Sequence, residues 1–207
     1  MELLLIRHGQ SIANAEGRIQ GQFDSPLSEQ GRAQSRALAR RLQRKGRSLA
    51  AIYASDLSRA AETAEIVATA LEAPLTLDAR LREYDCGVLT NVVWTDVEFL
   101  YPDIWHGFHH SREWVPISGE EGQEAFCTRL AAMVDGTLAR HQEEERVAFV
   151  SHGASLGMLL AHILGMEIHR PSPFRFGNTS LSILKLGPRG PALTLLNDTC
   201  HLDGDLR

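Results

Sequence analysis

The sequence predicts an α/β fold, a mostly parallel sheet flanked by helices, in a single domain spanning residues 1–207. Short apolar runs alternate with longer segments of helical periodicity, as in chains that form such sheets. Two of these runs, residues 3–6 and 147–150, are each followed within two residues by His-Gly. As parallel strands of one sheet they would bring both histidines to the sheet edge where α/β folds bind ligands.

The first half of the chain provides three strands and two helices. Ser28 is a favourable helix N-cap, Gly46 ends the first helical pattern and Pro74 ends the second. In order, the expected elements are a strand at 3–6, a helix between Ser28 and Gly46, a strand at 49–53, a helix at 60–71 and a strand at 75–77.

The second half begins with the least regular stretch of the chain. Residues 94–118 hold three tryptophans, several histidines and two prolines with weak periodicity, which predicts a loop-rich lid. Regular structure then resumes, with a helix at 126–138, a strand at 146–150, a helix at 154–164 closed by Gly165, and a terminal hairpin of strands at 181–186 and 193–196.

The net charge and the cysteine spacing limit the kinds of molecule that this chain is expected to bind. A net charge of −5 argues against a nucleic-acid or anionic-membrane surface, since both favour a basic excess. The three cysteines, Cys86, Cys127 and Cys200, lack the paired spacing of a zinc or redox motif, and no secretion signal or membrane span is evident. We therefore expect a cytoplasmic protein whose partner is a small molecule.

The residues at the two strand ends suit phosphoryl transfer. The imidazole of His8 can attack phosphorus and form a phosphohistidine, while Arg7, Arg59 and His152 hold the charged oxygens. Arg59 lies in the first turn of an expected helix, where backbone amides also favour an anion. Nearby guanidinium groups should lower the pKa of His8 and keep it neutral. Glu83 is placed to protonate the leaving group.

An ordered set of motifs resembles the histidine phosphatase superfamily over nearly the whole chain. The set comprises Arg7-His8-Gly9-Gln10-Ser11 with Asn14, Gln20-Gly21 with Asp24, Pro26, Leu27 and Gly31, Ser55-Asp56-Leu57-Ser58-Arg59-Ala60 with Thr63-Ala64, Leu81-Arg82-Glu83 with Gly87, and Ser151-His152-Gly153.

The resemblance implies a three-layer sandwich and a set of site residues. By it, His8 is the phosphorylated residue, Glu83 is the proton donor, and Arg7, Arg59 and His152 bind phosphate. It further implies that Asn14 assists and that Gln20 and the Gly153 backbone line the pocket, with no metal and no organic cofactor.

The chain departs from the family pattern at two places. Leu89-Thr90-Asn91 stands where members often carry an aromatic residue, Glu and Gly, and Asn91 can adopt the left-handed conformation that a glycine would. Glu121 stands where many members carry Ser, which puts the substrate contact at that position in doubt.

Simpler interpretations compete for several residues. Arg59 can pair with Glu62 on a helix surface, and Glu83 can pair with Arg82. Asn14 can cap a turn, and Gln20 can face solvent. The lid histidines, His106, His109 and His110, lack a carboxylate or thiol at ligand spacing and are expected to bind no metal, and Trp94, Trp105 and Trp114 are expected to anchor the lid, although one can close over the pocket.

Three functions follow from these patterns. The first is hydrolysis of a small phosphorylated metabolite, and the second is a phosphoglycerate-type mutase, which needs a field that attracts polyanions. Residues 94–118 carry one arginine against four carboxylates, a net charge of −3, which favours hydrolysis. The third is an inactive domain that binds phosphorylated ligands, but binding alone needs neither His8 nor Glu83. The natural substrate and the oligomeric state stay open.

Overall fold

Six strands form one sheet in the order β3-β2-β4-β1-β5-β6 in the computed structural model, which describes residues 1–46, 48–111, 114–167 and 173–206. The first four strands, β1 (Glu2–Arg7), β2 (Ala51–Ala54), β3 (Leu75–Leu77) and β4 (Arg146–Ser151), are parallel. The last two, β5 (Leu181–Gly187) and β6 (Gly190–Asp198), join antiparallel at the edge. The largely parallel sheet is as predicted.

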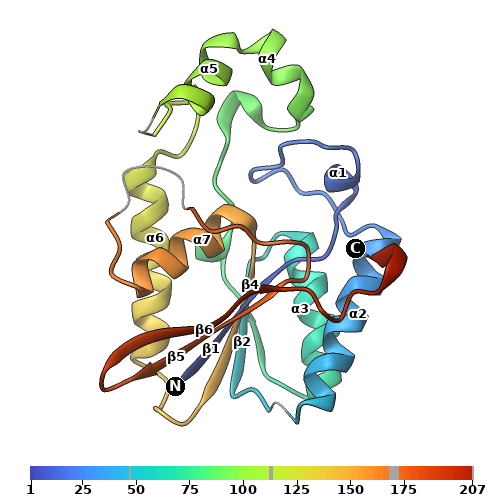
Figure 1. Ribbon diagram of the computed structural model, residues 1–207, viewed down its shortest axis with the longest axis vertical. Helices are drawn as coiled ribbons and strands as arrows, with labels where there is room; N and C mark the ends of the chain where they lie inside the picture. Colours follow the sequence, from blue (N-terminus) through green and yellow to red (C-terminus); the bar gives the residue numbers. More distant parts are fainter. Residues whose placement is uncertain (47, 112–113, 168–172, 207) are drawn as a thin grey trace.

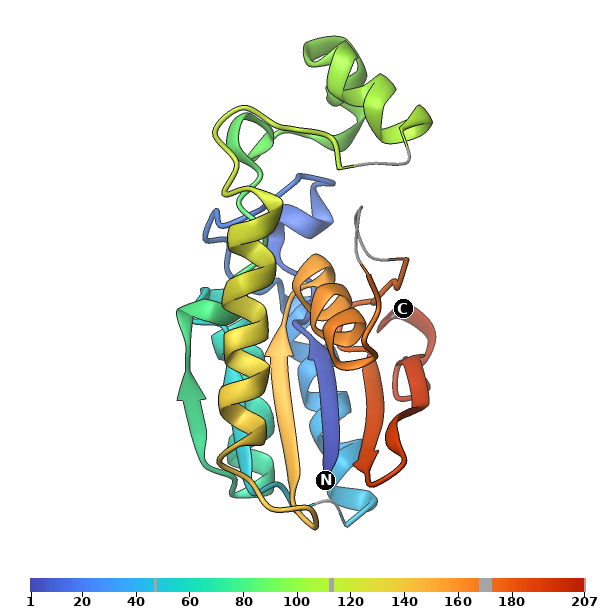
Figure 2. The same ribbon diagram turned by 90° about the vertical axis from the view of Figure 1, so that its left-hand side faces the viewer.

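Helices cover both faces of this sheet (Figures 1 and 2). On one side lie α2 (Glu29–Arg44) and α3 (Ser58–Leu71), and on the other lie α6 (Gln123–Leu138) and α7 (Gly153–Ile163). The three-layer sandwich is therefore confirmed. Among the residues that the structure describes, no helix is both long and apolar enough to cross a bilayer.

The apolar run of β1 serves two cores at once because successive side chains of a strand point to opposite faces. Leu3 and Leu5 pack in the cluster beneath α6 and α7, whereas Leu4 and Ile6 pack in the cluster beneath α2 and α3. All four side chains are fully buried. Burial of each of these side chains contributes about 1.5–3 kcal/mol to the stability of the fold, so β1 stabilises both cores.

Local sequence patterns predicted most ends of the helices and strands correctly. The Ser28 hydroxyl accepts a hydrogen bond from the amide of Gly31 and caps α2, as predicted. The second predicted helix ends in a left-handed residue, Glu72, two positions before Pro74. Strand β2 begins two residues later than expected, and β6 begins at Gly190 rather than at residue 193.

The lid is more helical than the sequence predicted. It contains a 3₁₀ turn (Trp94–Asp96), α4 (Val97–Leu100) and α5 (Pro102–His110), above the carboxyl ends of the parallel strands (Figure 2). Pro102, one of the two prolines on which the prediction of a loop-rich lid rested, is the first residue of α5, where a missing amide costs nothing. Arg112 and Glu113, which entered the charge count for this segment, lie outside the described residues.

Candidate active site

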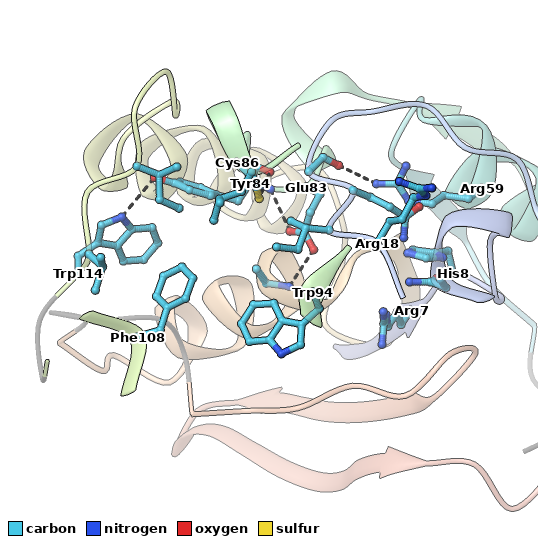
Figure 3. A pocket seen from close by; sticks show the side chains of 18 residues that line it. Arg7, His8, Arg18, Arg59, Glu83, Tyr84, Cys86, Trp94, Phe108 and Trp114 are labelled. Atoms are coloured by element: carbon cyan, nitrogen blue, oxygen red, sulfur yellow. Dashed lines mark hydrogen bonds between the residues drawn. The ribbon is translucent and has the colours of Figure 1, made fainter. Parts of the chain in front are cut away.

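A cavity of about 330 Å³ opens at the carboxyl ends of the parallel strands, beneath the lid (Figure 3). It gathers six of the eight residues predicted for the site. These are Arg7, His8, Asn14, Gln20, Arg59 and Glu83. The other two, His152 and Gly153, are absent from the described lining but lie next to lining residues, His152 beside His8 and Gly153 beside Arg7, so the structure brings the whole predicted set together.

The register of two neighbouring strands brings the histidines together. Arg7 of β1 pairs with Ser151 of β4, so His8 and His152 leave the sheet side by side, with ring centroids 5.1 Å apart. Gly9 continues the exit from β1 past the first turn of α2, where an added Cβ would lie 2.5 Å from the carbonyl oxygen of Gly31. Only glycine fits there, because real Cβ contacts are never that short.

The surroundings of His8 hold its imidazole neutral and oriented. Its Nδ1 lies 2.6 Å from the carbonyl oxygen of Gly9, so Nδ1 carries the proton and donates it, and Nε2 keeps a free lone pair. Burial lowers the pKa of His8 well below 6.5, and the charges of Arg7 and Arg59 lower it further. A neutral ring with a free Nε2 is the form that attacks phosphorus.

Two buried guanidinium groups face this ring. Arg7 donates from Nη1 to the carbonyl of Phe176 at 2.6 Å, and Arg59 donates from Nη1 and Nη2 to the carbonyls of Phe23 and Gly21. Within the described residues, the buried Nε atoms of both arginines have no partner. Both side chains line the cavity, and each Nη group keeps at least one N–H that an oxyanion there can bind.

Arg59 lies in the first turn of α3, as predicted, and is only 1% exposed. Burial lowers its pKa to about 10, so it stays charged at neutral pH. The alternative pairing of Arg59 with Glu62 is wrong, because Glu62 pairs with Arg32 at 2.5 Å.

His152 is fully buried beside His8. Its Nε2 lies 2.9 Å from the Ser55 hydroxyl, which already accepts from the amide of Leu57 and so can donate to Nε2. That arrangement leaves Nδ1–H as a donor, and this atom has no partner in the described chain. Gly153 begins α7 and lies near Arg7, where a smaller cavity of about 230 Å³ adjoins the main one.

Glu83 is held by the amino end of α7. Its carboxylate accepts hydrogen bonds of 3.0 Å from the amides of Tyr84, Ala154 and Ser155, and one of the same length from the Ser155 hydroxyl. A helix amino end stabilises a carboxylate in this position. The alternative ion pair with Arg82 is wrong, because Arg82 binds Asp56.

Asn14 and Gln20 line the cavity and also form hydrogen bonds with Ser11. Asn14 belongs to α1 (Ile12–Ala15), a helical turn that the sequence analysis missed, and forms a capping box with Ser11. Gln20 accepts from the Ser11 hydroxyl at 2.7 Å and is 8% exposed, so its expected alternative of facing solvent is wrong. Asn14 caps a turn, as one interpretation held, and also lines the cavity.

Sequence reasoning missed the residue that fixes the Glu83 loop. Arg129 of α6 donates to the carbonyls of Arg80, Arg82 and Glu83 and forms a bidentate ion pair with Glu121. Glu121 in turn accepts from the amide of Asp85. The residue whose substrate contact was in doubt therefore binds the Glu83 loop and is absent from the described lining of the cavity. The replacement of the family's Ser by Glu was the available signal.

Asn178 is a second missed residue. From the segment before β5, its side-chain amide donates to the carbonyl of His8 at 3.1 Å and to Asn14 at 3.4 Å. It therefore links the backbone of the candidate nucleophile to α1. Nothing local in the sequence around Asn178 indicated this contact.

The lid supplies the far wall of the cavity. Trp94, Phe108 and Trp114 line it, while Trp105 packs in the small lid core of Leu89, Val97 and Ile117. The three lid histidines lie exposed on α5 and are absent from the described lining. Asn91 has a φ of 65°, the left-handed conformation predicted for it.

Comparison with known proteins identifies the family. The model of the histidine phosphatase superfamily (branch 1) matches residues 3–199. This chain belongs to that superfamily. A relative named "Probable phosphoglycerate mutase GpmB", from Enterobacter sp. (strain 638), is 35% identical over 212 residues, which cover 98% of this chain and 95% of the relative.

Two solved structures extend the comparison. Bacillus stearothermophilus YhfR has a TM-score of 0.83 and 31% identity, with 98% of this chain and 99% of that chain covered. A mycobacterial glucosyl-3-phosphoglycerate phosphatase, solved as a complex with VO3, has a TM-score of 0.83 and 29% identity, with 95% and 98% covered. The chain is thus a histidine phosphatase, an enzyme that acts on phosphate monoesters.

Proposed function

We propose that this histidine phosphatase hydrolyses small phosphorylated metabolites in the cytoplasm through a phosphohistidine on His8. The observation that carries the proposal is the state of His8. Its Nδ1–H is committed to the carbonyl of Gly9, which leaves Nε2 unprotonated, and its ring lines the same cavity as the guanidinium groups of Arg7 and Arg59. A phosphoryl group bound by Arg7, Arg59 and His152 would sit against that nitrogen.

The reaction proceeds in two balanced steps. In the first, the Nε2 lone pair forms a bond to phosphorus, the bond from phosphorus to the ester oxygen breaks, and Glu83 gives the leaving oxygen its proton. In the second, Glu83 takes a proton from water, the water oxygen bonds to phosphorus, and the bond to Nε2 breaks. Inorganic phosphate and neutral His8 result, with Arg7 and Arg59 stabilising the negative charge throughout.

The alternative is a phosphoglycerate-type mutase, which the name of the Enterobacter relative favours. A mutase returns the phosphoryl group to bound product and must hold a second anionic group nearby. Outside the phosphate end, Arg18 is the cation of the described lining, and it is already paired with Glu16 at 2.7 Å. We therefore favour hydrolysis.

Rapid acid-free quenching with a ³²P-labelled ester tests the proposal. We expect label on His8 that is stable to base and labile to acid, and a loss of turnover on the order of 10⁴-fold or more in His8→Ala. His162→Ala, which replaces an exposed histidine at the far end of α7, should keep both label and turnover.

Two outcomes would contradict the proposal. Full turnover by His8→Ala would exclude the covalent route. Conversion of 3-phosphoglycerate to its isomer faster than release of phosphate would favour the mutase.

A further inference from the structure

The cavity has two chemically different ends (Figure 3). Arg7, His8 and Arg59 lie at one end, and the rings of Trp94, Phe108 and Trp114 lie toward the other. Ile19, Leu89, Val115 and Ile117 complete the apolar wall. The phosphate end fixes one anionic group, so the opposite end must receive the alcohol part of the ester.

We propose that this lid end selects phosphate esters of an uncharged aromatic or otherwise apolar alcohol. The inference rests on the proposed function, because it names the substrate class of the same site. The lid residues that carry it are Trp94 and Phe108, with Trp114 closing the wall.

The aromatic side chains are arranged to accept a flat or apolar group. The ring of Trp94 stacks on that of Phe108, with centroids 6.1 Å apart and an interplanar angle of 12°, and packs at 56° against Trp105. Trp105 fixes Trp94 from the lid core, yet Trp94 is still 45% exposed. An exposed, fixed indole at the wall of a cavity is a surface that gains free energy when an apolar group covers it.

The polar side-chain atoms of Trp114, Tyr84 and Cys86 at this end are already committed to protein partners. The indole N–H of Trp114 donates to the Tyr84 hydroxyl at 3.2 Å, and that hydroxyl donates to Glu120. Burial raises the pKa of the Cys86 thiol to about 12, so it is neutral. These groups therefore offer an incoming carboxylate no replacement for its lost hydration.

The remaining cation of the described lining is already neutralised. Arg18 donates from Nε to Glu16 at 2.7 Å and from Nη1 to the carbonyl of Asn91 at 3.0 Å. A carboxylate that approached Arg18 would meet an ion pair and the negative charge of Glu16 rather than a free cation. The described lining thus favours an alcohol without charge over one that carries a second anion.

Three esters of primary alcohols test the inference, since their leaving groups have similar acidity. We expect kcat/KM for 2-phenylethyl phosphate to exceed that for glycerol 3-phosphate and for 3-phosphoglycerate by about 10-fold or more, the worth of burying one phenyl ring. A preference for either polar ester would overturn the inference and leave the proposed function intact. Release of phosphate from none of the three would remove the proposed function and the inference together.

Lid variants show whether the preference arises where we place it. Trp94→Ala and Phe108→Ala should each lower kcat/KM for 2-phenylethyl phosphate by about 10-fold and change that for glycerol 3-phosphate less than about twofold. Phe99→Ala is the matched control, because Phe99 lies on α4, is 82% exposed and is absent from the described lining. Persistence of the full preference in both cavity variants would overturn the inference.

Discussion

The base and the lid of the cavity are built by different forces. At the base, hydrogen bonds hold the reactive groups, as His8 is held by Gly9, Glu83 by the amino end of α7 and Arg59 by two carbonyls. At the lid, the wall consists of rings packed on rings. Hydrogen bonds fix direction, which chemistry on one atom requires, whereas apolar packing is non-directional and tolerates different shapes.

This difference predicts a division of labour. Changes at the base should alter the chemical step for every ester. Changes at the lid should alter which ester is bound. Replacements in each region test that division.

Replacement of the proton donor at the base has the largest expected effect. Glu83→Gln keeps the shape but removes the exchangeable proton, so kcat/KM for glycerol 3-phosphate, which reports formation of the phosphohistidine, should fall about 10²- to 10⁴-fold. For p-nitrophenyl phosphate, whose leaving group needs no proton, the loss in kcat/KM should be far smaller. Steady-state kinetics on both esters measure this difference, with Glu65→Gln on the exposed face of α3 as control. An equal loss on the two esters would show that Glu83 is not the acid.

A pair of valines compares the stability of the two regions. Val147 in the main core and Val97 in the lid core are both fully buried. Val147→Ala should lower the free energy of unfolding by about 2 kcal/mol, since two methyl groups and their packing are lost. Val97→Ala should instead loosen the lid, with faster amide exchange there and a smaller change in global stability. Urea unfolding and hydrogen exchange measure both, and equal global losses would show that lid and base unfold as one unit.

Loosening the Glu83 loop should have a smaller effect on catalysis. Lysine cannot reproduce the forked contacts of Arg129 with three carbonyls and Glu121, so Arg129→Lys should lower kcat/KM for glycerol 3-phosphate by about 10-fold. The kcat/KM for p-nitrophenyl phosphate should change less than about twofold, because the loop positions the acid and this leaving group needs none. A purely structural role would lower both rates alike. Arg44→Lys, at the exposed end of α2, is the matched control.

The smallest expected effect concerns a buried histidine that is absent from the described lining of the cavity. His201 lies between Thr179 and Arg41, and burial, followed by the charge of Arg41, lowers its pKa to about 4. The unfolded chain, with a pKa near 6.5, therefore binds more protons than the folded one between these values. The stability from neutral His201 is complete above about pH 6.5 and is lost as pH falls toward 4.

Urea unfolding at two pH values measures this contribution. Between pH 7.5 and 5.5, the wild type should lose about 1 kcal/mol more stability than His201→Gln. His109→Gln is the matched lid variant, because His109 is exposed on α5 and is solvated in both states. A wild-type loss no greater than that of His201→Gln would contradict the assignment.

Local sequence signals predicted the strands and helices beneath the cavity more completely than the helices of the lid. The apolar run of β1, the cap at Ser28 and the helix break before Pro74 are short-range patterns, and the structure follows them. In the lid, where the prolines predicted loops, Pro102 instead begins a helix. The periodicity there was too short to be read, because α4 and α5 contribute only a few turns to a small core.

Strand ends and motif order along the chain were sufficient to predict the parallel strands, the neighbouring positions of His8 and His152 and the gathering of Arg7, Arg59 and Glu83. Other contacts are visible only in the folded chain: Arg129 and Glu121 hold the Glu83 loop, Asn178 binds the backbone of His8, and Trp94 and Phe108 form a stacked wall. These contacts join residues far apart in the chain, or rings whose orientation packing alone sets, so no local pattern could have encoded them.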